Sequence, residues 1–236
     1  MHGVDWRAVY ESYAAMLPDI YSREDLSFVM SEMVSELNIG HAYVQGGDFE
    51  DQPQVSVGMI GAEFELVKPG SNNAPDATPE QGAYRLARII TGAPWDLDGR
   101  GPLSQPGVQA KAGQFLLAVN GVPLDPTRDP YAAFQGLAGV PTYITLSDRP
   151  VLDGTEREVL ITPQGSEAGP RYREWIERNR AYVAEKTNGT VGYIYVPNTG
   201  VDGQNDLFRQ FFGQRHLDGL IIDERWNGGG QIPTRF

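Results

Sequence analysis

A run of glycines near the end of the sequence could present bare backbone N–H groups to a ligand. The apolar residues 220–222 lead through Asp223 into a turn, and Gly228, Gly229 and Gly230 follow. Glycine runs cost backbone entropy, so they are expected where a partner approaches the main chain closely. N–H groups in such a loop can bind an oxyanion that develops during acyl transfer, at ~3 kcal/mol of barrier per donor. A sharp turn without a ligand is the alternative for the same residues.

Other chemistries fit this region less well. A P-loop needs a Lys directly after its glycines, and the stretch after Gly230 has none; nor is there a G-x-G-x-x-G motif with a following acidic residue. Asp223 and Glu224 have no His or further carboxylate at ligand spacing, which argues against a metal or a paired-carboxylate site. We therefore predict neither a metal nor another cofactor, and we expect Asp223 to orient the glycine loop.

His41 is the candidate for proton transfer. It is one of three histidines, and it follows a patterned segment, whereas His2 lies near the terminus and His216 lies in a polar turn. A catalytic general base needs a nucleophile within hydrogen-bond reach and a third group that orients its other nitrogen. Spacing alone identifies no such trio, so a structural histidine at a helix end is the alternative.

Composition limits the class of protein. The 236 residues include 28 Gly and 17 Pro, which indicates many turns and strands and predicts a mixed α and β protein. A net charge of −12 argues against binding to nucleic acid or to an anionic membrane. No apolar run approaches the ~18 residues of a membrane span. The absence of cysteine excludes a disulfide framework and a thiol nucleophile.

Hydrophobic periodicity and turn residues divide the chain into three parts. Two helices are predicted first, the second starting with a capping box at Ser22–Asp25, followed by a strand from His41 to Val44. Short strands and one short helix follow, at 57–67, 84–90, 114–119, 129–134, 143–146 and 157–161, with a hairpin turn at Asn120 and Gly121. The last part alternates helix and strand, at 171–187, 191–196, 206–214 and 219–223.

The last three of these elements form a strand–helix–strand unit, which predicts a right-handed crossover between parallel strands. This unit places residues 227–230 at the carboxyl end of the second strand, the edge at which open α/β sheets bind ligands.

Four blocks in this order resemble the tricorn protease family of serine peptidases, which belongs to the tail-specific (C-terminal processing) group. They are ELNIGHAY at 36–43, RYREWIERNRAY at 171–182, GTVGYIYVP at 189–197 and GLIIDERWNGGG at 219–230. The resemblance covers essentially the whole chain. It implies a first core subdomain at 1–52, a PDZ-like domain at 55–150, and at 151–236 the start of a second core subdomain with a ClpP/crotonase-like αββ fold.

The resemblance also implies roles for individual residues. His41 would be the general base, and the N–H of Gly228 or Gly229 would contribute to the oxyanion hole. The PDZ loop for a peptide carboxylate would comprise Gly58, Met59, Ile60 and Gly61. The serine nucleophile and its orienting glutamate are expected beyond residue 236. The family has a Ser directly before the His, where this chain has Gly40.

The implied function is that of a segment of a serine peptidase that cleaves short peptides through an acyl-enzyme, without metal or ATP. Residues 1–236 alone are expected to be inactive, and the complete protein is expected to form hexamers. The N-terminus lacks signal-peptide features, which predicts a cytoplasmic location, or a periplasmic one if a longer parent carries a signal. The alternative is a non-catalytic PDZ-type peptide-binding module or scaffold.

Overall fold

The computed structural model describes residues 3–48, 54–72, 74–76, 78–93, 95–96 and 99–231. The chain divides into two compact units, Met1–Gln54 and Val55–Phe236. The fold class is mixed α and β, as predicted: helices come first, then an antiparallel sheet, and then an α/β segment with parallel strands.

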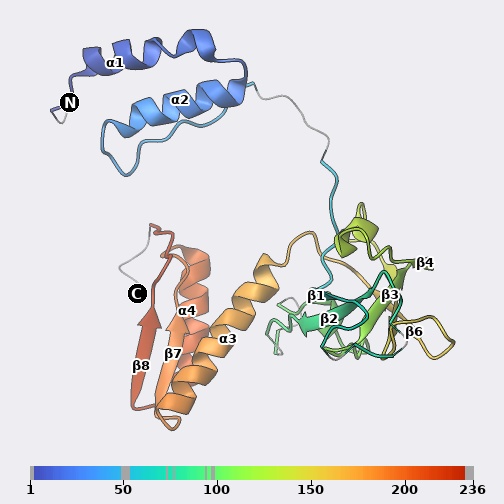
Figure 1. Ribbon diagram of the computed structural model, residues 1–236. Helices are drawn as coiled ribbons and strands as arrows, with labels where there is room; N and C mark the ends of the chain where they lie inside the picture. The colour runs from blue at the N-terminus through green and yellow to red at the C-terminus, as the bar shows by residue number, and fades with distance from the viewer. Residues whose placement is uncertain are drawn as a thin grey trace. The chain divides into compact units, whose positions relative to one another are not determined.

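Unit 1 is a helical hairpin. Helix α1 (Trp6–Ala14) is followed by the short 3-10 helix η1 (Leu17–Asp19) and by α2 (Arg23–Ser35), and α1 and α2 lie side by side (Figure 1). The capping box is confirmed, because Ser22 accepts from the N–H of Asp25 while the Asp25 carboxylate accepts from the N–H of Ser22. Neither helix buries a residue completely within the chain.

The predicted strand from His41 to Val44 is wrong. Residues 40 and 41 form a turn, and residues 42–48 have no regular structure. A strand needs a neighbour with which to exchange backbone hydrogen bonds, and the described part of unit 1 contains no other strand. The Tyr43 hydroxyl instead donates to the Gly40 carbonyl at 2.9 Å, which folds this short stretch back on itself.

Unit 2 begins with an antiparallel sheet in the order β1-β2-β3-β5-β6, with β4 paired to β3. Its strands are β1 (Ala62–Val67), β2 (Ala83–Ile89), β3 (Phe115–Val119), β4 (Val122–Pro123), β5 (Thr142–Ser147) and β6 (Arg157–Ile161). The predicted hairpin is confirmed: Asn120 and Gly121 have φ of 48° and 76°, and Val119 pairs with Val122. Because β6 pairs with β5, this sheet extends to Ile161.

The first strand is shorter than predicted. Val57 and Met59 form only isolated bridges, to Gln135 and Gln164, and β1 starts at Ala62. Gly61 separates these stretches, because its φ of +80° lies outside the extended region.

The sheet encloses a core to which the 3-10 helices η2 (Pro102–Ser104) and η3 (Pro130–Phe134) contribute. Its fully buried members include Ile60, Leu86, Leu103, Leu116, Phe134, Ile144 and Leu146. This core fixes the start of β1, since Ile60 is completely buried next to Gly61.

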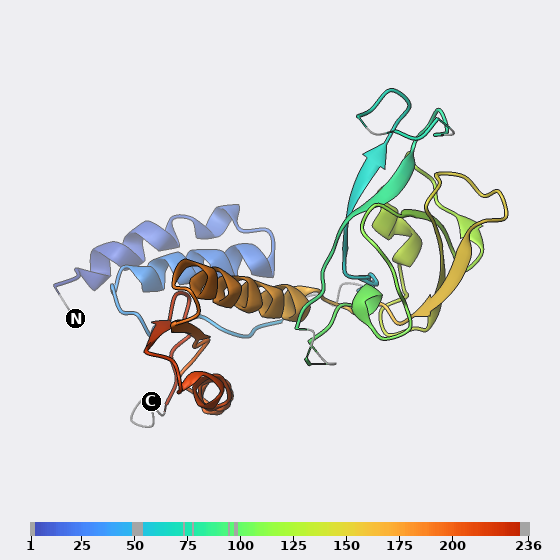
Figure 2. The ribbon, with the colours of Figure 1, turned by 90° about the horizontal axis from the view of Figure 1, so that it is seen from below.

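The rest of unit 2 consists of α3 (Ala168–Lys186), β7 (Val191–Tyr195), α4 (Val201–Gln214) and β8 (Gly219–Asp223) (Figures 1 and 2). Strands β7 and β8 are parallel, as predicted. Alternate residues of β7 face different helices. Tyr193 and Tyr195 pack with α3, whereas Ile194 packs with Leu207 of α4.

Helix α4 begins five residues earlier than predicted. The side-chain Oδ1 of Asn198 accepts from the N–H groups of Gly200 and Gly203, at 2.9 and 3.1 Å. This side chain satisfies two N–H groups at the helix start that have no partner within the helix. The glycines of this first turn do not show an apolar repeat, so periodicity alone missed it.

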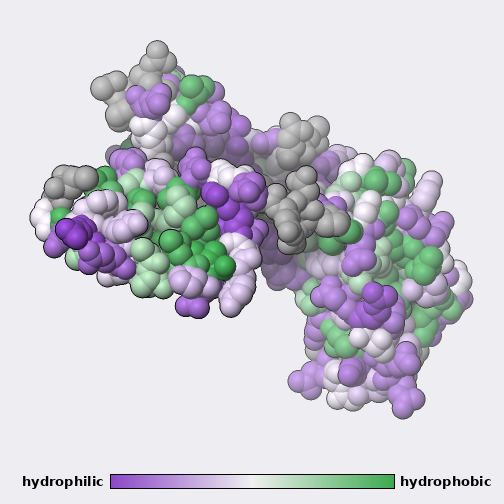
Figure 3. Space-filling view, turned by 90° about the horizontal axis from the view of Figure 1, so that it is seen from above, coloured by the Kyte–Doolittle hydropathy of each residue, from purple (hydrophilic) through white to green (hydrophobic). Residues whose placement is uncertain are grey.

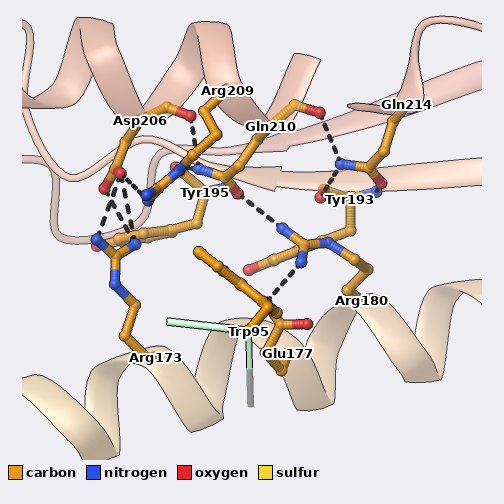
Figure 4. Close-up of polar contacts among 10 residues, drawn as sticks. All are labelled: Trp95, Arg173, Glu177, Arg180, Tyr193, Tyr195, Asp206, Arg209, Gln210 and Gln214. Atoms are coloured by element: carbon orange, nitrogen blue, oxygen red, sulfur yellow. Dashed lines mark hydrogen bonds and ion pairs between the residues drawn. The ribbon is translucent and has the colours of Figure 1, made fainter. Parts of the chain in front are cut away.

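Two glutamines of α4 cover the edge of β7 that does not pair with β8 (Figure 4). Gln210 accepts from the N–H of Tyr195 and donates to its carbonyl, at 3.3 and 3.1 Å. Gln214 does the same for Tyr193, at 2.9 and 3.0 Å. The side-chain amides thus replace a neighbouring strand, which leaves fewer unpaired backbone groups on this edge.

Hydrophilic residues cover most of the surface that is visible in Figure 3, with smaller patches of apolar side chains between them. None of the helices among the described residues is long and apolar enough to cross a membrane. Across those same residues, no three His, Asp or Glu side chains gather in an arrangement that could hold a metal ion.

Candidate functional site

The glycine loop follows β8 and lies against the segment that follows β7. The Gly228 N–H donates to the Pro197 carbonyl at 2.9 Å, and the Thr199 N–H donates to the Gly229 carbonyl at 2.8 Å. The Asn227 side chain adds a bond from Nδ2 to the Val196 carbonyl at 3.0 Å. Because β7 and β8 are parallel, both segments leave the same carboxyl edge of the sheet.

The two candidate oxyanion donors are engaged differently. The N–H of Gly228 is bound to a main-chain carbonyl, whereas the N–H of Gly229 donates to the Oδ1 of Asn227 at 2.7 Å. A side-chain acceptor can leave by rotation, but a main-chain carbonyl can leave only if the backbone moves. Gly229 also has φ of +74° and no neighbouring atom within 4 Å of the position that a Cβ would take. Its surroundings are therefore open on that side.

Asp223 anchors the start of this loop. It is only 8% exposed, and its carboxylate accepts from the Tyr193 hydroxyl at 2.6 Å and from the N–H and guanidinium of Arg225. Hydrogen bonds from Arg225, and then from Tyr193, hold the pKa of Asp223 well below its usual range. Burial and the bond to Asp223 raise the pKa of Tyr193 to about 12. Asp223 thus stays ionised and holds the turn at Arg225, before the glycines, while its orienting of the glycine loop itself stays a prediction.

Aromatic rings support the same turn from the side of α3. The Trp175 ring packs edge-on against the Tyr195 ring, with 4.8 Å between the ring centroids, and its centroid lies 5.7 Å from that of the Trp226 ring. The Tyr195 hydroxyl donates to the Arg225 carbonyl at 2.7 Å. Trp226 itself has φ of +60°, which is uncommon for a bulky residue. The backbone therefore turns sharply just before the glycines.

His41 lies in unit 1, on the exposed turn after α2. Its ring is 6.3 Å from the ring of Tyr43 in an edge-on arrangement. Within the described part of unit 1, no Ser, Asp or Glu side chain is hydrogen-bonded to the imidazole. A Cβ on Gly40 would meet nothing within 4 Å, so a serine could be accommodated at this position.

The predicted peptide-carboxylate loop directly precedes β1, an edge strand of the sheet. The N–H of Gly58 donates to the Phe134 carbonyl at 2.9 Å, and the N–H of Met59 donates to the Gln164 carbonyl at 2.7 Å. The N–H of Gly61 differs, because it donates to the Glu167 carboxylate at 2.9 Å. One amide of the predicted loop is therefore already bound to a carboxylate.

Ion pairs link α3 to the start of the sheet. Arg88 of β2 contacts Glu63 of β1 and Glu174 of α3, each at 2.6 Å, and Arg171 of α3 also reaches Glu63 at 3.0 Å. Hydrogen bonds from Arg88 and Arg171 lower the pKa of Glu63 to about 2. These side chains are partly exposed, so each pair contributes little to stability, typically below about 1 kcal/mol.

Two residues with evident roles were missed by the sequence analysis. Asn227 could have been found, because an Asn before a glycine run often bonds to the nearby backbone. Glu167 could not, because its role depends on a bond from Gly61, which lies 106 positions away.

Two models of known domain families match separate stretches of the chain. The tricorn protease C1 domain model matches residues 1–35, and the tricorn protease PDZ domain model matches residues 74–166. Tricorn protease homolog 1 of Streptomyces coelicolor is 34% identical over 98% of this chain and 20% of its own length. A putative tricorn-like protease C-terminal subunit of Sulfurisphaera tokodaii is 31% identical over 97% of this chain and 24% of its own length.

A solved structure gives the same result. The crystal structure of the tricorn protease matches 96% of this chain with a TM-score of 0.79 and 30% identity, and the match covers 20% of that protein. The chain thus spans about a fifth of the length of the curated relatives that it matches. The chain belongs to the tricorn protease family and corresponds to the part of its C-terminal region that holds the C1 and PDZ domains.

Proposed function

We propose that these residues form part of the active site of a tricorn-type serine peptidase that hydrolyses short peptides through an acyl-enzyme. His41 would act as the general base, and the N–H of Gly229 would help to bind the oxyanion. The serine nucleophile and the glutamate that orients the histidine would come from outside residues 1–236. The main support is the glycine loop at the carboxyl edge of β7 and β8, in a chain that belongs to a peptidase family.

We favour Gly229 over Gly228 for a geometric reason. An oxyanion could replace the Oδ1 of Asn227 at the Gly229 N–H if the Asn227 side chain rotates, which would also release its bond to the Val196 carbonyl but would leave the main-chain bonds of the loop intact. The same replacement at Gly228 would break the main-chain bond to Pro197 that holds the loop in place. A hydrogen bond made only in the transition state lowers the barrier, and Asn227 would keep this donor oriented before the reaction.

The test uses fluorogenic peptides and two proteins, residues 1–236 and a longer parent chain that contains them. Residues 1–236 should show no turnover, because a general base without a nucleophile cannot form an acyl-enzyme. In the parent, His41→Ala should reduce kcat at least about 10³-fold, by analogy with other serine peptidases. His216→Ala is the matched control, since His216 is also exposed. Turnover by residues 1–236 that depends on His41 would contradict the need for an external serine.

Gly40 gives a second test of the histidine's role. Because the position is open, Gly40→Ser should fold normally. If a hydroxyl beside the imidazole assists His41, this substitution should raise the kcat of the parent. An unchanged kcat, with retained dependence on His41, would show that the auxiliary hydroxyl is dispensable here.

A second candidate function is the capture of peptide chain ends by the PDZ domain. It is favoured by β1, an edge strand to which a peptide could add, and by the bond from Gly61 to a carboxylate next to it. Binding of peptides to residues 1–236 should then require a free C-terminal carboxylate, and C-terminal amidation should abolish it. Hexamer formation by the parent and a cytoplasmic location remain predictions, and analytical ultracentrifugation would test the first of them.

A further inference from the structure

Glu167 holds its carboxylate in a site built from three separate parts of unit 2. Its Oε1 accepts from the Gly61 N–H at 2.9 Å and lies 3.3 Å from the Tyr131 hydroxyl. Its Oε2 accepts from the Nε and Nη2 of Arg171 at 3.0 and 2.8 Å. The Glu167 side chain is only 9% exposed. Both oxygens are therefore satisfied by donors inside a nearly closed site.

This arrangement is unusual for the residue's position in the helix. Glu167 is the N-cap residue of α3, where an acidic side chain commonly accepts from the helix's own N–H groups. Here its side chain makes no such bond, and the Ser166 hydroxyl accepts from the Ala168 N–H instead. One carboxylate oxygen instead reaches a glycine 106 positions earlier in the chain, while the other is held by Arg171 of the same helix.

The site also lies where a bound peptide would end. Gly61 closes the loop before β1, and among the described residues β1 pairs on one side only, with β2. The Tyr131 hydroxyl donates to the Ala62 carbonyl at 2.9 Å, next to the bond from Gly61 to Glu167. A peptide that added to β1 would place its terminal carboxylate among the groups that surround Glu167, which are the Gly61 N–H, the Tyr131 hydroxyl and Arg171.

We propose that the Glu167 carboxylate occupies the site for a peptide's C-terminal carboxylate on the PDZ domain, so that a peptide end binds there only after Glu167 leaves. This inference rests on the proposed capture of chain ends by the PDZ domain. Tyr131 and Arg171 then serve the incoming carboxylate as they serve Glu167. A site that is competent only part of the time binds more weakly in proportion to that fraction, so Glu167 sets the affinity.

The test measures binding of labelled hexapeptides of randomised sequence to residues 1–236 by fluorescence polarisation. One peptide pool has free C-termini and the other has C-terminal amides. Glu167→Ala should lower the Kd for the free-acid pool at least about tenfold, and the amide pool should bind neither the wild type nor this variant. Glu167→Gln, which keeps the shape but removes the charge, should give a smaller gain in the same direction.

Glu174→Ala is the matched control, because it also removes a contact of α3 with the sheet, the ion pair to Arg88. It should leave the Kd unchanged, and circular dichroism should show that every variant is folded. Adding Arg171→Gln to Glu167→Ala should weaken binding of the free-acid pool again.

Failure of the proposed role of Glu167 and failure of the proposed capture of chain ends would give different results. If the wild type and both Glu167 variants bind the free-acid pool with equal Kd, and not the amide pool, capture of chain ends stands but the role of Glu167 is overturned. The same conclusion follows if Glu174→Ala tightens binding as much as Glu167→Ala does. If no folded variant binds either pool, the proposed capture of chain ends fails together with this inference.

Discussion

Asp223 gives the sharpest test of how the glycine loop is held. Asp223→Ala removes the acceptor of the Tyr193 hydroxyl and of the N–H and guanidinium of Arg225. The buried hydroxyl loses a hydrogen bond to a charged group, worth about 1.5–3 kcal/mol. The Arg225 side chain is 63% exposed and regains water, so its ion pair should add less than about 1 kcal/mol. We expect a loss of about 2–4 kcal/mol in the free energy of unfolding.

Urea unfolding followed by tryptophan fluorescence measures this loss, because Trp175 and Trp226 lie beside the turn. A double-mutant cycle with Tyr193→Phe isolates the hydroxyl–carboxylate bond, for which we expect a coupling of at least about 1 kcal/mol. Glu224→Ala is the matched control. The neighbouring Glu224 is exposed, so this substitution should change the free energy of unfolding by less than about 0.5 kcal/mol.

The contribution of Asp223 to the free energy of unfolding should fall as the pH is lowered. The pKa of Asp223 is lower in the folded protein than the usual ~3.9 of an unfolded chain. Its charge therefore stabilises the fold above about pH 4, and this contribution is lost as the pH falls from there toward the folded-state pKa. The stability difference between wild type and Asp223→Asn should be largest near neutral pH and should shrink below about pH 4. A difference that grows on acidification, or a coupling near zero, would refute the assigned role of Asp223.

Three further predictions concern the rest of unit 2. Gly61→Ala should lower the free energy of unfolding by about 1–3 kcal/mol, as measured by thermal unfolding, and by more than Gly107→Ala does. Both glycines have positive φ, but of the two only Gly61 has an atom close to the position of a new Cβ, the Gly101 Cα at 3.2 Å. Gln210→Leu should lower the free energy of unfolding in urea by about 1–3 kcal/mol, because the N–H and carbonyl of the buried Tyr195 would lose their side-chain partner. An unchanged urea midpoint would contradict this. Arg88→Ala should raise the pKa of Glu63 from about 2 toward its usual ~4.3, as followed by NMR titration of the carboxyl carbon, with little change in melting temperature.

Much of the fold could be predicted because the relevant signals are local. The apolar run at 191–196, the helix before it and the Asn120–Gly121 turn each specify their own structure through nearest neighbours in the chain. The carboxyl-edge position of the glycine loop then follows from the parallel crossover, and the loop does lie against residues 196–199. Local patterns are thus enough to locate this edge of the sheet.

The features that sequence reasoning missed depend on partners that are distant or not periodic. The stretch from His41 to Val44 has the composition of a strand but finds no strand to pair with in the described part of unit 1. The start of α4 depends on the Asn198 side chain rather than on apolar spacing. The contact between Gly61 and Glu167 joins two parts of unit 2 that no short motif connects.

The two edges of the β7–β8 sheet limit where a nucleophile could approach the glycine loop. Gln210 and Gln214 occupy the backbone groups on the free edge of β7, so another strand cannot add there without displacing them. The opposite strand carries Ile221 and Ile222, which are 45% and 54% exposed within this chain. Under the proposed function, a segment that adds in parallel beside β8 would end at the same carboxyl edge as Gly229. Among the described residues, the β8 side combines an open strand edge with access to the proposed oxyanion donor, so the nucleophile should approach from that side.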